Sequence, residues 1–385
     1  MFHVRRRRAA FTLRGLLASA LAAMAVIGVT AAGTGASGDD NHYTVTCQRD
    51  IRVPVTLASG RPAGAAVTGE LCSSWAERLP GQTVQLLVPG ASYTHDYWDF
   101  GTVDGTSYSY ARAVAAEGIA TFAIDPLGSG DSSHPASRQI TAQADAYVDH
   151  QVVQALREGV IAGIRFRKVI AVGHSLNSLI VWDEAIAYHD VDGVIVTGVA
   201  HSLAAAFASS GGFYPAAKDP KFAGRGLDPG YLTTVPGVRG KLFYHLASAD
   251  PVVIALDEAR KDVFSGTELT TALPVVSDTA TRAIDVPVLD VLGSDDFTTC
   301  GPSTTGRAFD CSSGAAVAAQ EAPFYSPQAH LRACVIPGSG HDISLAPDNI
   351  RQVEDTVAWS ETFVAHRWPG RAPGQGGHSL PSNCG

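Results

Sequence analysis

Short apolar runs alternate with helical patterns along most of this 385-residue chain. The runs VQLLV, IATFAI, VIAV, VDGVIVTGV, VPVLDVL and LRACVIPG are rich in β-branched residues, as is typical of strands buried on both faces. This alternation predicts an α/β fold with a mostly parallel sheet and helices on both faces. Before it, residues 43–71 predict antiparallel edge strands. Helices are predicted at about 108–117, 141–164, from 176 onward, 315–321 and 348–368.

One segment interrupts the alternation. Residues 201–282 are rich in glycine, proline and aromatic residues, including GGFYP and DPGYLTTVPG, and they predict an insertion in the α/β domain. With 45% hydrophobic and 17% charged residues, the chain fits neither a disordered protein nor a membrane bundle. We therefore expect one domain over 39–385, with 201–282 as an insertion in it.

The first 38 residues have the pattern of a bacterial-type export signal. Arg5–Arg8 are followed by an apolar stretch from about 15 to 32 and then by small residues. A nucleic-acid-binding arm is the alternative for the arginines, but the apolar stretch directly behind them favours targeting. Cleavage is expected within 31–38, and the sequence leaves Sec and twin-arginine export open. We expect a secreted protein with no stable membrane anchor after cleavage.

Charge and cysteine content agree with that compartment. Removing residues 1–38 takes away five arginines and no acidic residues, which leaves 23 basic against 37 acidic residues and a net charge of −14. Such a surface argues against nucleic acid as a partner. The six cysteines are even in number and form no CxxC pair, so disulfides between nearest neighbours along the chain are expected rather than a metal site. They are Cys47, Cys72, Cys300, Cys311, Cys334 and Cys384.

Ser175 lies at the point where one strand pattern gives way to a helix, in KVIAVGHSLNSLIVWDE. Serine is a favoured N-cap, so the simpler interpretation is that Ser175 caps the helix. The alternative is a nucleophile elbow, a strained turn that exposes the hydroxyl beside the amides of the helix start. If Ser175 is a nucleophile, the N–H groups of Ala91 and Leu176 are the natural pair to bind the oxyanion.

Two further strand ends carry chemistry that a serine nucleophile needs. GSDDFTTC places Asp295 and Asp296 after VPVLDVL, and PGSGHDI places His341 after LRACVIPG. A serine requires a base within hydrogen-bond reach, and a carboxylate must hold that base in the right tautomer. Asp250 is the rival acid, since LFYHLASADP also resembles a strand followed by an acidic turn.

These motifs together resemble those of the α/β-hydrolase superfamily, over nearly all of residues 39–385. GHSLN resembles the elbow, VPGAS the oxyanion turn, VLGSDD the acid loop and PGSGHDI the histidine turn. The resemblance implies Ser175 as nucleophile, His341 as base, Asp296 as acid and Ala91 and Leu176 as oxyanion donors. It also implies that residues 201–282 form an inserted cap, or lid, over the active site. The elbow departs from G-x-S-x-G because it ends in Asn177, which predicts a slightly displaced helix start.

The expected activity is hydrolysis of a carboxylic ester, or a lactone, through an acyl-enzyme. The same triad could serve a thioesterase, an acyltransferase or a peptidase, and a noncatalytic binding protein of the same fold is a further alternative. No metal or organic cofactor is implied. Six aromatic residues of the insertion favour a small apolar or aromatic ester as substrate. They are Phe207, Phe213, Tyr214, Tyr231, Phe243 and Tyr244.

Overall fold

The computed structural model describes residues 44–74, 82–365 and 381–385. The expected export signal, residues 1–38, lies outside them. Among the described residues, no helix combines the length and the apolar character needed to cross a membrane.

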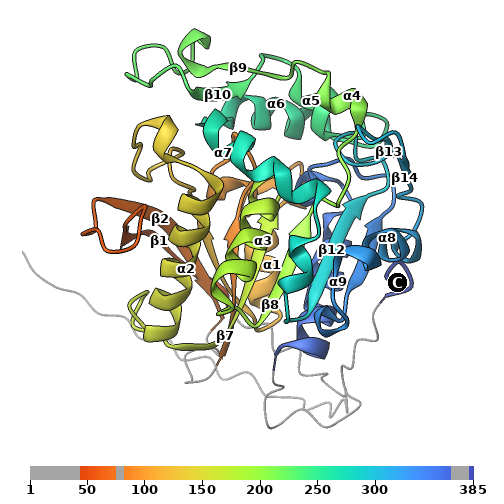
Figure 1. Ribbon diagram of the computed structural model, residues 1–385, viewed down its shortest axis with the longest axis horizontal. Helices are drawn as coiled ribbons and strands as arrows, with labels where there is room; N and C mark the ends of the chain where they lie inside the picture. Colours follow the sequence, from red (N-terminus) through yellow and green to blue (C-terminus); the bar gives the residue numbers. More distant parts are fainter. Residues whose placement is uncertain (1–43, 75–81, 366–380) are drawn as a thin grey trace, which may run out of the picture. The chain divides into compact units, whose positions relative to one another are not determined.

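The central feature of the fold is a sheet that has eight strands within the described residues, in the order β1-β2-β6-β3-β7-β8-β12-β15 (Figure 1). The strands from β6 to β15 pair in parallel, whereas β1 and β2 form an antiparallel edge. The predicted α/β-hydrolase fold with a mostly parallel sheet is thus confirmed. The strands are β1 (Thr46–Val55), β2 (Ala65–Ser73), β3 (Gln82–Val88), β6 (Ala120–Ile124), β7 (Phe166–His174), β8 (Gly193–Thr197), β12 (Val288–Gly293) and β15 (Arg332–Ile336).

Helices cover both faces of this sheet. Side chains of α2 and α3 share one buried cluster with the sheet, and side chains of α1 and α9 share another. The hydroxyl of Thr141 caps α2 by accepting the N–H of Ala144. Gly159, with φ 77°, ends α2 in a left-handed turn, so this helix is shorter than predicted. The helices are α1 (Tyr110–Ala116), α2 (Ala142–Glu158), α3 (Leu176–Tyr188), α8 (Gly314–Glu321) and α9 (Asn349–Phe363).

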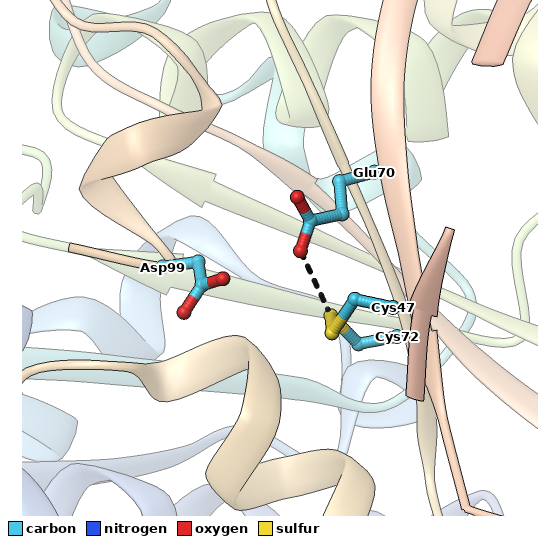
Figure 2. A group of neighbouring side chains, drawn as sticks. All are labelled: Cys47, Glu70, Cys72 and Asp99. Carbon is cyan, nitrogen blue, oxygen red and sulfur yellow. Dashed lines mark hydrogen bonds between the residues drawn. A yellow bond between two sulfur atoms is a disulfide. The ribbon is translucent and has the colours of Figure 1, made fainter. Parts of the chain in front are cut away.

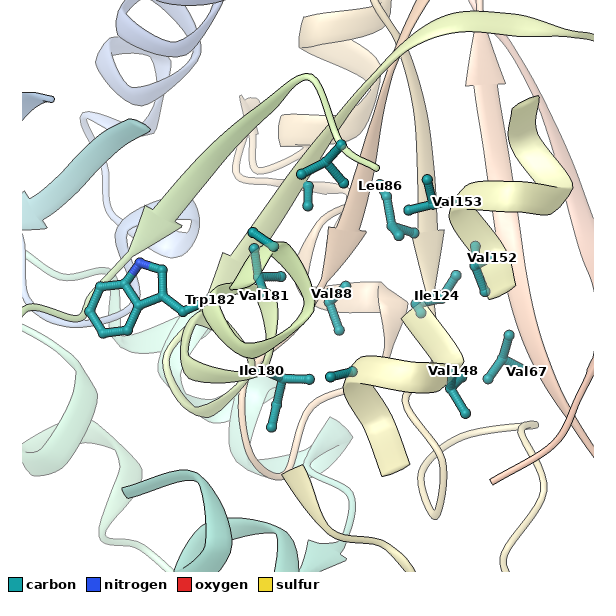
Figure 3. Close-up of a cluster of buried hydrophobic side chains, with 14 of the residues drawn as sticks. Val67, Leu86, Val88, Ile124, Val148, Val152, Val153, Ile180, Val181 and Trp182 are labelled. Carbon is teal, nitrogen blue, oxygen red and sulfur yellow. The ribbon is translucent and has the colours of Figure 1, made fainter. Parts of the chain in front are cut away.

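The core beneath α2 and α3 contains mostly aliphatic side chains, together with Trp182 (Figure 3). Leu86 and Val88 of β3 pack in one cluster with Val152 of α2 and Ile180 of α3, and all four are almost fully buried. Burial of each such side chain contributes about 1.5–3 kcal/mol. The sheet and its helices therefore form a firm support for the loops at the strand ends.

The chain between β8 and β12, which contains the expected insertion 201–282, forms short helices and a small antiparallel sheet in the order β11-β10-β9. Figure 1 shows most of these elements at the top of the view. The expectation that Asp250 follows a strand is wrong, because its side chain caps a helix by accepting the N–H of Val252. The elements are α4 (Ala205–Ala208), β9 (Phe213–Pro215), β10 (Tyr231–Thr234), α5 (Arg239–Phe243), α6 (Pro251–Arg260), β11 (Phe264–Ser265) and α7 (Gly266–Ala272).

Three disulfides join the six cysteines, which is compatible with an extracellular protein. Cys47 and Cys72 are direct partners in the register of β1 and β2. Figure 2 shows the carboxylate of Glu70 beside this bond, with its Oε1 atom 3.4 Å from the Cys72 sulfur. Asp99 lies near the same group, but disulfide sulfurs are not thiolate ligands, so this group is not a cysteine metal site. The pairs are Cys47–Cys72, Cys300–Cys311 and Cys334–Cys384.

Candidate active site

Ser175 occupies a sharp turn between β7 and α3. Its backbone has φ 53° and ψ −125°, a conformation that costs a residue with a side chain about 1–3 kcal/mol. The hydroxyl makes no capping hydrogen bond to the start of α3. The simple capping interpretation is therefore wrong, and the backbone has the strained geometry of an elbow.

Two glycines allow this turn to form. A Cβ atom on Gly90 would lie 2.8 Å from the Cβ of Ser175, and one on Gly173 would lie 2.5 Å from the carbonyl oxygen of Asn177. Asn177 takes the place of a third small residue, and its side-chain amide donates to the carbonyl of Pro89 at 2.6 Å. This hydrogen bond joins the start of α3 to the loop after β3. It is a specific contact that the sequence did not reveal.

His341 lies between Ser175 and Asp296. Its Nε2 atom is 2.8 Å from the Oγ of Ser175, and its Nδ1 atom is 2.9 Å from the Oδ2 of Asp296. The other carboxylate oxygen of Asp296 accepts hydrogen bonds from the backbone N–H and the hydroxyl of Thr298, both at 2.7 Å. Thr298 was not among the predicted site residues, although the D-x-T spacing of this loop could have indicated its bond to Asp296.

The other acidic candidates lie elsewhere. Asp295 faces His245, with its Oδ1 atom 3.4 Å from the Nδ1 of that histidine, and its side chain is 43% exposed. Asp250 caps α6 through its Oδ1 atom. Of the acids considered from the sequence, the structure thus brings Asp296 to the Nδ1 atom of His341.

The surroundings of His341 favour its protonated form. Burial alone would lower its pKa, but the charge of Asp296, the hydrogen bond from Nδ1 to Asp296 and the charge of Asp342 together raise the pKa above 6.5. A more basic imidazole is a better acceptor for a serine proton, provided that it is neutral before the reaction.

The two predicted oxyanion donors, the backbone N–H groups of Ala91 and Leu176, belong to the segments on either side of the elbow. Leu176 is the first residue of α3, so its N–H has no acceptor within the helix. Ala91 follows the close contact between Gly90 and Ser175, and it is almost fully buried at 8% exposed. The two amides therefore flank the elbow from the β3 loop and from the start of α3.

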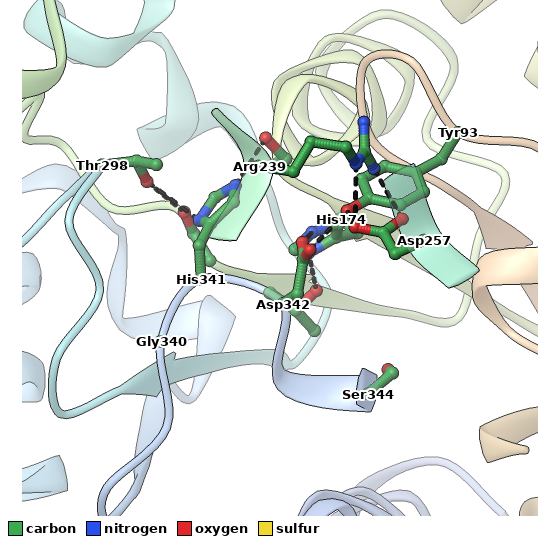
Figure 4. Close-up of polar contacts among 12 residues, drawn as sticks. Tyr93, His174, Arg239, Asp257, Thr298, Gly340, His341, Asp342 and Ser344 are labelled. Carbon is green, nitrogen blue, oxygen red and sulfur yellow. Dashed lines mark hydrogen bonds and ion pairs between the residues drawn. The ribbon is translucent and has the colours of Figure 1, made fainter. Parts of the chain in front are cut away.

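A buried hydrogen-bond network lies behind His341 (Figure 4). Asp342 accepts from the hydroxyl of Tyr93, and its Oδ1 atom is 3.2 Å from the Nε2 of His174. The rings of His174 and His341 are 4.8 Å apart. Burial, then repulsion by Asp257, raises the pKa of Asp342 to about 7. Burial and the neighbouring His341 lower the pKa of His174 well below 6.5, which favours the neutral form of this ring.

The network continues into the insertion through Arg239 and Asp257. Their side chains form two hydrogen bonds of 2.8 Å, and both are essentially inaccessible to solvent. Arg239 also donates to the hydroxyl of Ser92, next to Ala91, and its guanidinium lies 4.1 Å from the ring centre of Tyr93. Nothing in the sequence pattern pointed to these residues.

The aromatic residues expected to meet a substrate are partly occupied in packing. Tyr231, Phe243 and Tyr244 are buried, and the ring of Phe243 lies 5.5 Å from that of His341. A pocket of about 560 Å³ lies beside the acid loop, with Tyr244 and Asp296 in its wall, but Ser175 is not among its lining residues. We therefore assign no substrate to that pocket.

Comparison with known proteins identifies the family. The model of the alpha/beta hydrolase family matches residues 85–353. No curated protein matches the chain in sequence. The matched range includes every residue of the arrangement around Ser175.

Among solved structures, the chain resembles a soluble variant of monoglyceride lipase from Saccharomyces cerevisiae in complex with a substrate analogue. The two are 16% identical, with 80% of this chain and 96% of that chain covered and a TM-score of 0.53. An esterase from Exiguobacterium antarcticum is 15% identical, with 77% and 96% covered and a TM-score of 0.51. At such low identity these likenesses concern the fold.

Proposed function

The chain belongs to the alpha/beta hydrolase family, and on this premise we propose that it is an exported serine hydrolase that cleaves a carboxylic ester or lactone. The observation that carries the proposal is the pair of contacts made by His341, 2.8 Å to Ser175 and 2.9 Å to Asp296. Nucleophile, base and orienting acid are the parts that acyl transfer requires.

In the proposed reaction, the Oγ of Ser175 attacks the ester carbonyl carbon while His341 takes the hydroxyl proton. The carbonyl oxygen becomes an oxyanion that accepts from the N–H groups of Ala91 and Leu176. The intermediate collapses, the C–O bond to the alcohol breaks, and His341 returns the proton to the leaving oxygen. Water then attacks the acyl-enzyme by the same steps, which releases the acid and restores Ser175.

Export is part of the proposal. It rests on the signal-like pattern of residues 1–38 and on compatibility with the three disulfides. We further propose that residues 201–282 act as a cap. The carbonyl of Phe243 in this segment accepts the N–H of Asp342, next to the base, and Arg239 bonds Ser92, next to the oxyanion loop. The proposed substrate is a small apolar or aromatic ester.

The test is a hydrolysis screen of the secreted protein over esters, lactones, thioesters and amides. Ser175→Ala should lower turnover by about a millionfold and abolish labelling by a fluorophosphonate probe. Ser209→Ala is the matched control, since the hydroxyl of Ser209 donates to the carbonyls of Ala205 and Ala206 in its own exposed turn. Ester turnover that survives in Ser175→Ala would contradict the proposal.

A further inference from the structure

A second cluster of ionisable side chains lies between α2 and α3, away from the candidate active site. It consists of His150 on α2, Glu184 on α3 and Asp190 in the loop after α3, and their potential ligand atoms lie within 4.8 Å of one another. Glu184 follows Ser175 by nine residues, which places it roughly 13 Å along the helix. The proposed mechanism makes no use of these residues.

The cluster lacks hydrogen-bond donors. Glu184 is fully buried, and neither of its carboxylate oxygens has a donor among the described residues. The Oδ1 atom of Asp190 likewise has no donor among the described residues. Only the Oδ2 atom of Asp190 is satisfied, by the Nδ1 of His150 at 2.7 Å and the side-chain amide of Gln154 at 2.5 Å. Three buried carboxylate oxygens of this cluster therefore have no donor among the described residues.

A single proton cannot provide a hydrogen bond to all three of these oxygens. Burial, followed by the closeness of the Asp190 carboxylate, raises the pKa of Glu184 well above 4.5, which favours one proton shared between the two acids. One proton bridges two oxygens and leaves the third without a partner, at a cost of about 1–3 kcal/mol. The guanidinium of Arg157 bonds the backbone oxygen of Asp190 and the carboxylate of Asp192, so it leaves these oxygens unpaired.

We propose that His150, Glu184 and Asp190 bind a zinc ion. One imidazole nitrogen with two carboxylates is a donor set that zinc accepts, and the imidazole argues against calcium or magnesium. Zinc bonds of about 2.0–2.2 Å at tetrahedral angles separate the ligand atoms by about 3.3 Å, so the contact between His150 and Asp190 opens slightly on binding.

The surroundings suit such a site. The side chains of His150 and Asp190 are 25% and 15% exposed, which gives the ion access from solvent, while Glu184 forms the buried floor. The ring of Tyr188 stacks on His150 at 4.2 Å, and Gln154 holds Asp190, so both outer ligands are oriented. The ion would join α2 to α3 and to the loop that leads into β8.

The experiment measures zinc binding by the tag-free full chain after removal of metal with a chelator. Equilibrium dialysis with elemental analysis should give one zinc ion per chain, and zinc should raise the melting temperature. Glu184→Gln and His150→Gln should each weaken binding by at least about a hundredfold. Asp183→Asn is the matched control, because it changes an acid to an amide on the same helix and should bind as the wild type does.

Since free thiols are absent from the described residues, cysteines there do not compete for the ion. The proposal is overturned if the chain binds no zinc, or if the zinc that it binds is retained by both variants. It is also overturned if Glu184→Gln has a higher melting temperature than the wild type at saturating zinc. The carboxylates of Glu184 and Asp190 would then need a proton and not a metal ion. None of these readouts depends on ester hydrolysis, so the site and the proposed function can fail separately.

Discussion

Replacing Asp296 by asparagine tests the proposed acid with almost no change in shape. The Oδ1 atom of Asp296 accepts two hydrogen bonds from Thr298, so the asparagine oxygen will keep that side. Its NH₂ group then faces the Nδ1 atom of His341, which must become an acceptor. The imidazole proton moves to Nε2, facing the hydroxyl of Ser175, and the base can no longer take the serine proton.

The wrong tautomer lowers turnover by about ten-thousandfold in a comparable triad, which corresponds to about 5.4 kcal/mol in the activation barrier. The assay is initial-rate hydrolysis of the best ester found in the screen, together with the rate of fluorophosphonate labelling. Asp295→Asn is the matched control, with the same charge change one residue away on a side chain that is 43% exposed, and its rate should stay within about twofold of the wild type.

The rival acid is tested in the same series. Asp250→Asn should leave turnover unchanged, because Asp250 caps α6 and does not contact His341. A collapse confined to Asp250→Asn, or an Asp296→Asn enzyme with a tenth or more of the wild-type rate, would refute the assignment of Asp296. Circular dichroism and the melting temperature separate such a loss from unfolding.

Three further outcomes are expected. Ester turnover should rise with pH through an apparent pKa above 6.5, because His341 acts as a base only when neutral and its pKa is raised; a pH-rate profile with its midpoint below 6.5 would contradict this. Replacing Cys300 and Cys311 together by serine should cost about 3 kcal/mol of unfolding free energy in urea, and an unchanged midpoint would argue against the bond. Asp257→Asn should lower the free energy of unfolding in urea by about 3–5 kcal/mol, because the charge of Arg239 would stay buried without its partner. Changing Asp257 to leucine and Arg239 to methionine together should lower it by less.

The sheet could be predicted from the sequence because its strands carry a strong local signal. The run from Val169 to Val172 in β7 is buried and contains no polar residue, and the helix that follows shows its period at once. Helix ends were less predictable, since the end of α2 depends on the left-handed conformation of Gly159. The segment before Asp250 was misread because its apolar residues form a short helix and a turn rather than a strand.

The candidate site was predictable only where a residue lies in the loop or turn that follows a strand. Ser175, Asp296 and His341 do so, and their closeness rests on the rule that the carboxyl ends of parallel strands meet at one edge. Asn177 donates to Pro89, which is far away in the sequence, and Thr298 donates to Asp296, two residues before it. The periodicity of strands and helices predicts neither of these hydrogen bonds. The roles of Ser175 and Asp296 remain predictions that the variants above can test.

Arg239 and Asp257, which the sequence did not predict, indicate what the segment between β8 and β12 contributes to the site. Arg239 and Asp257 belong to α5 and α6, yet their ion pair reaches Ser92 beside one proposed oxyanion donor, and Tyr93 links Asp257 to Asp342 beside the proposed base. A buried ion pair is a poor source of stability, because desolvation offsets most of its attraction. The ion pair nonetheless constrains the positions of its partners, since the planar guanidinium presents its N–H donors in fixed directions. One buried network therefore joins α5 and α6 both to the loop after β3 and to the turn that carries His341.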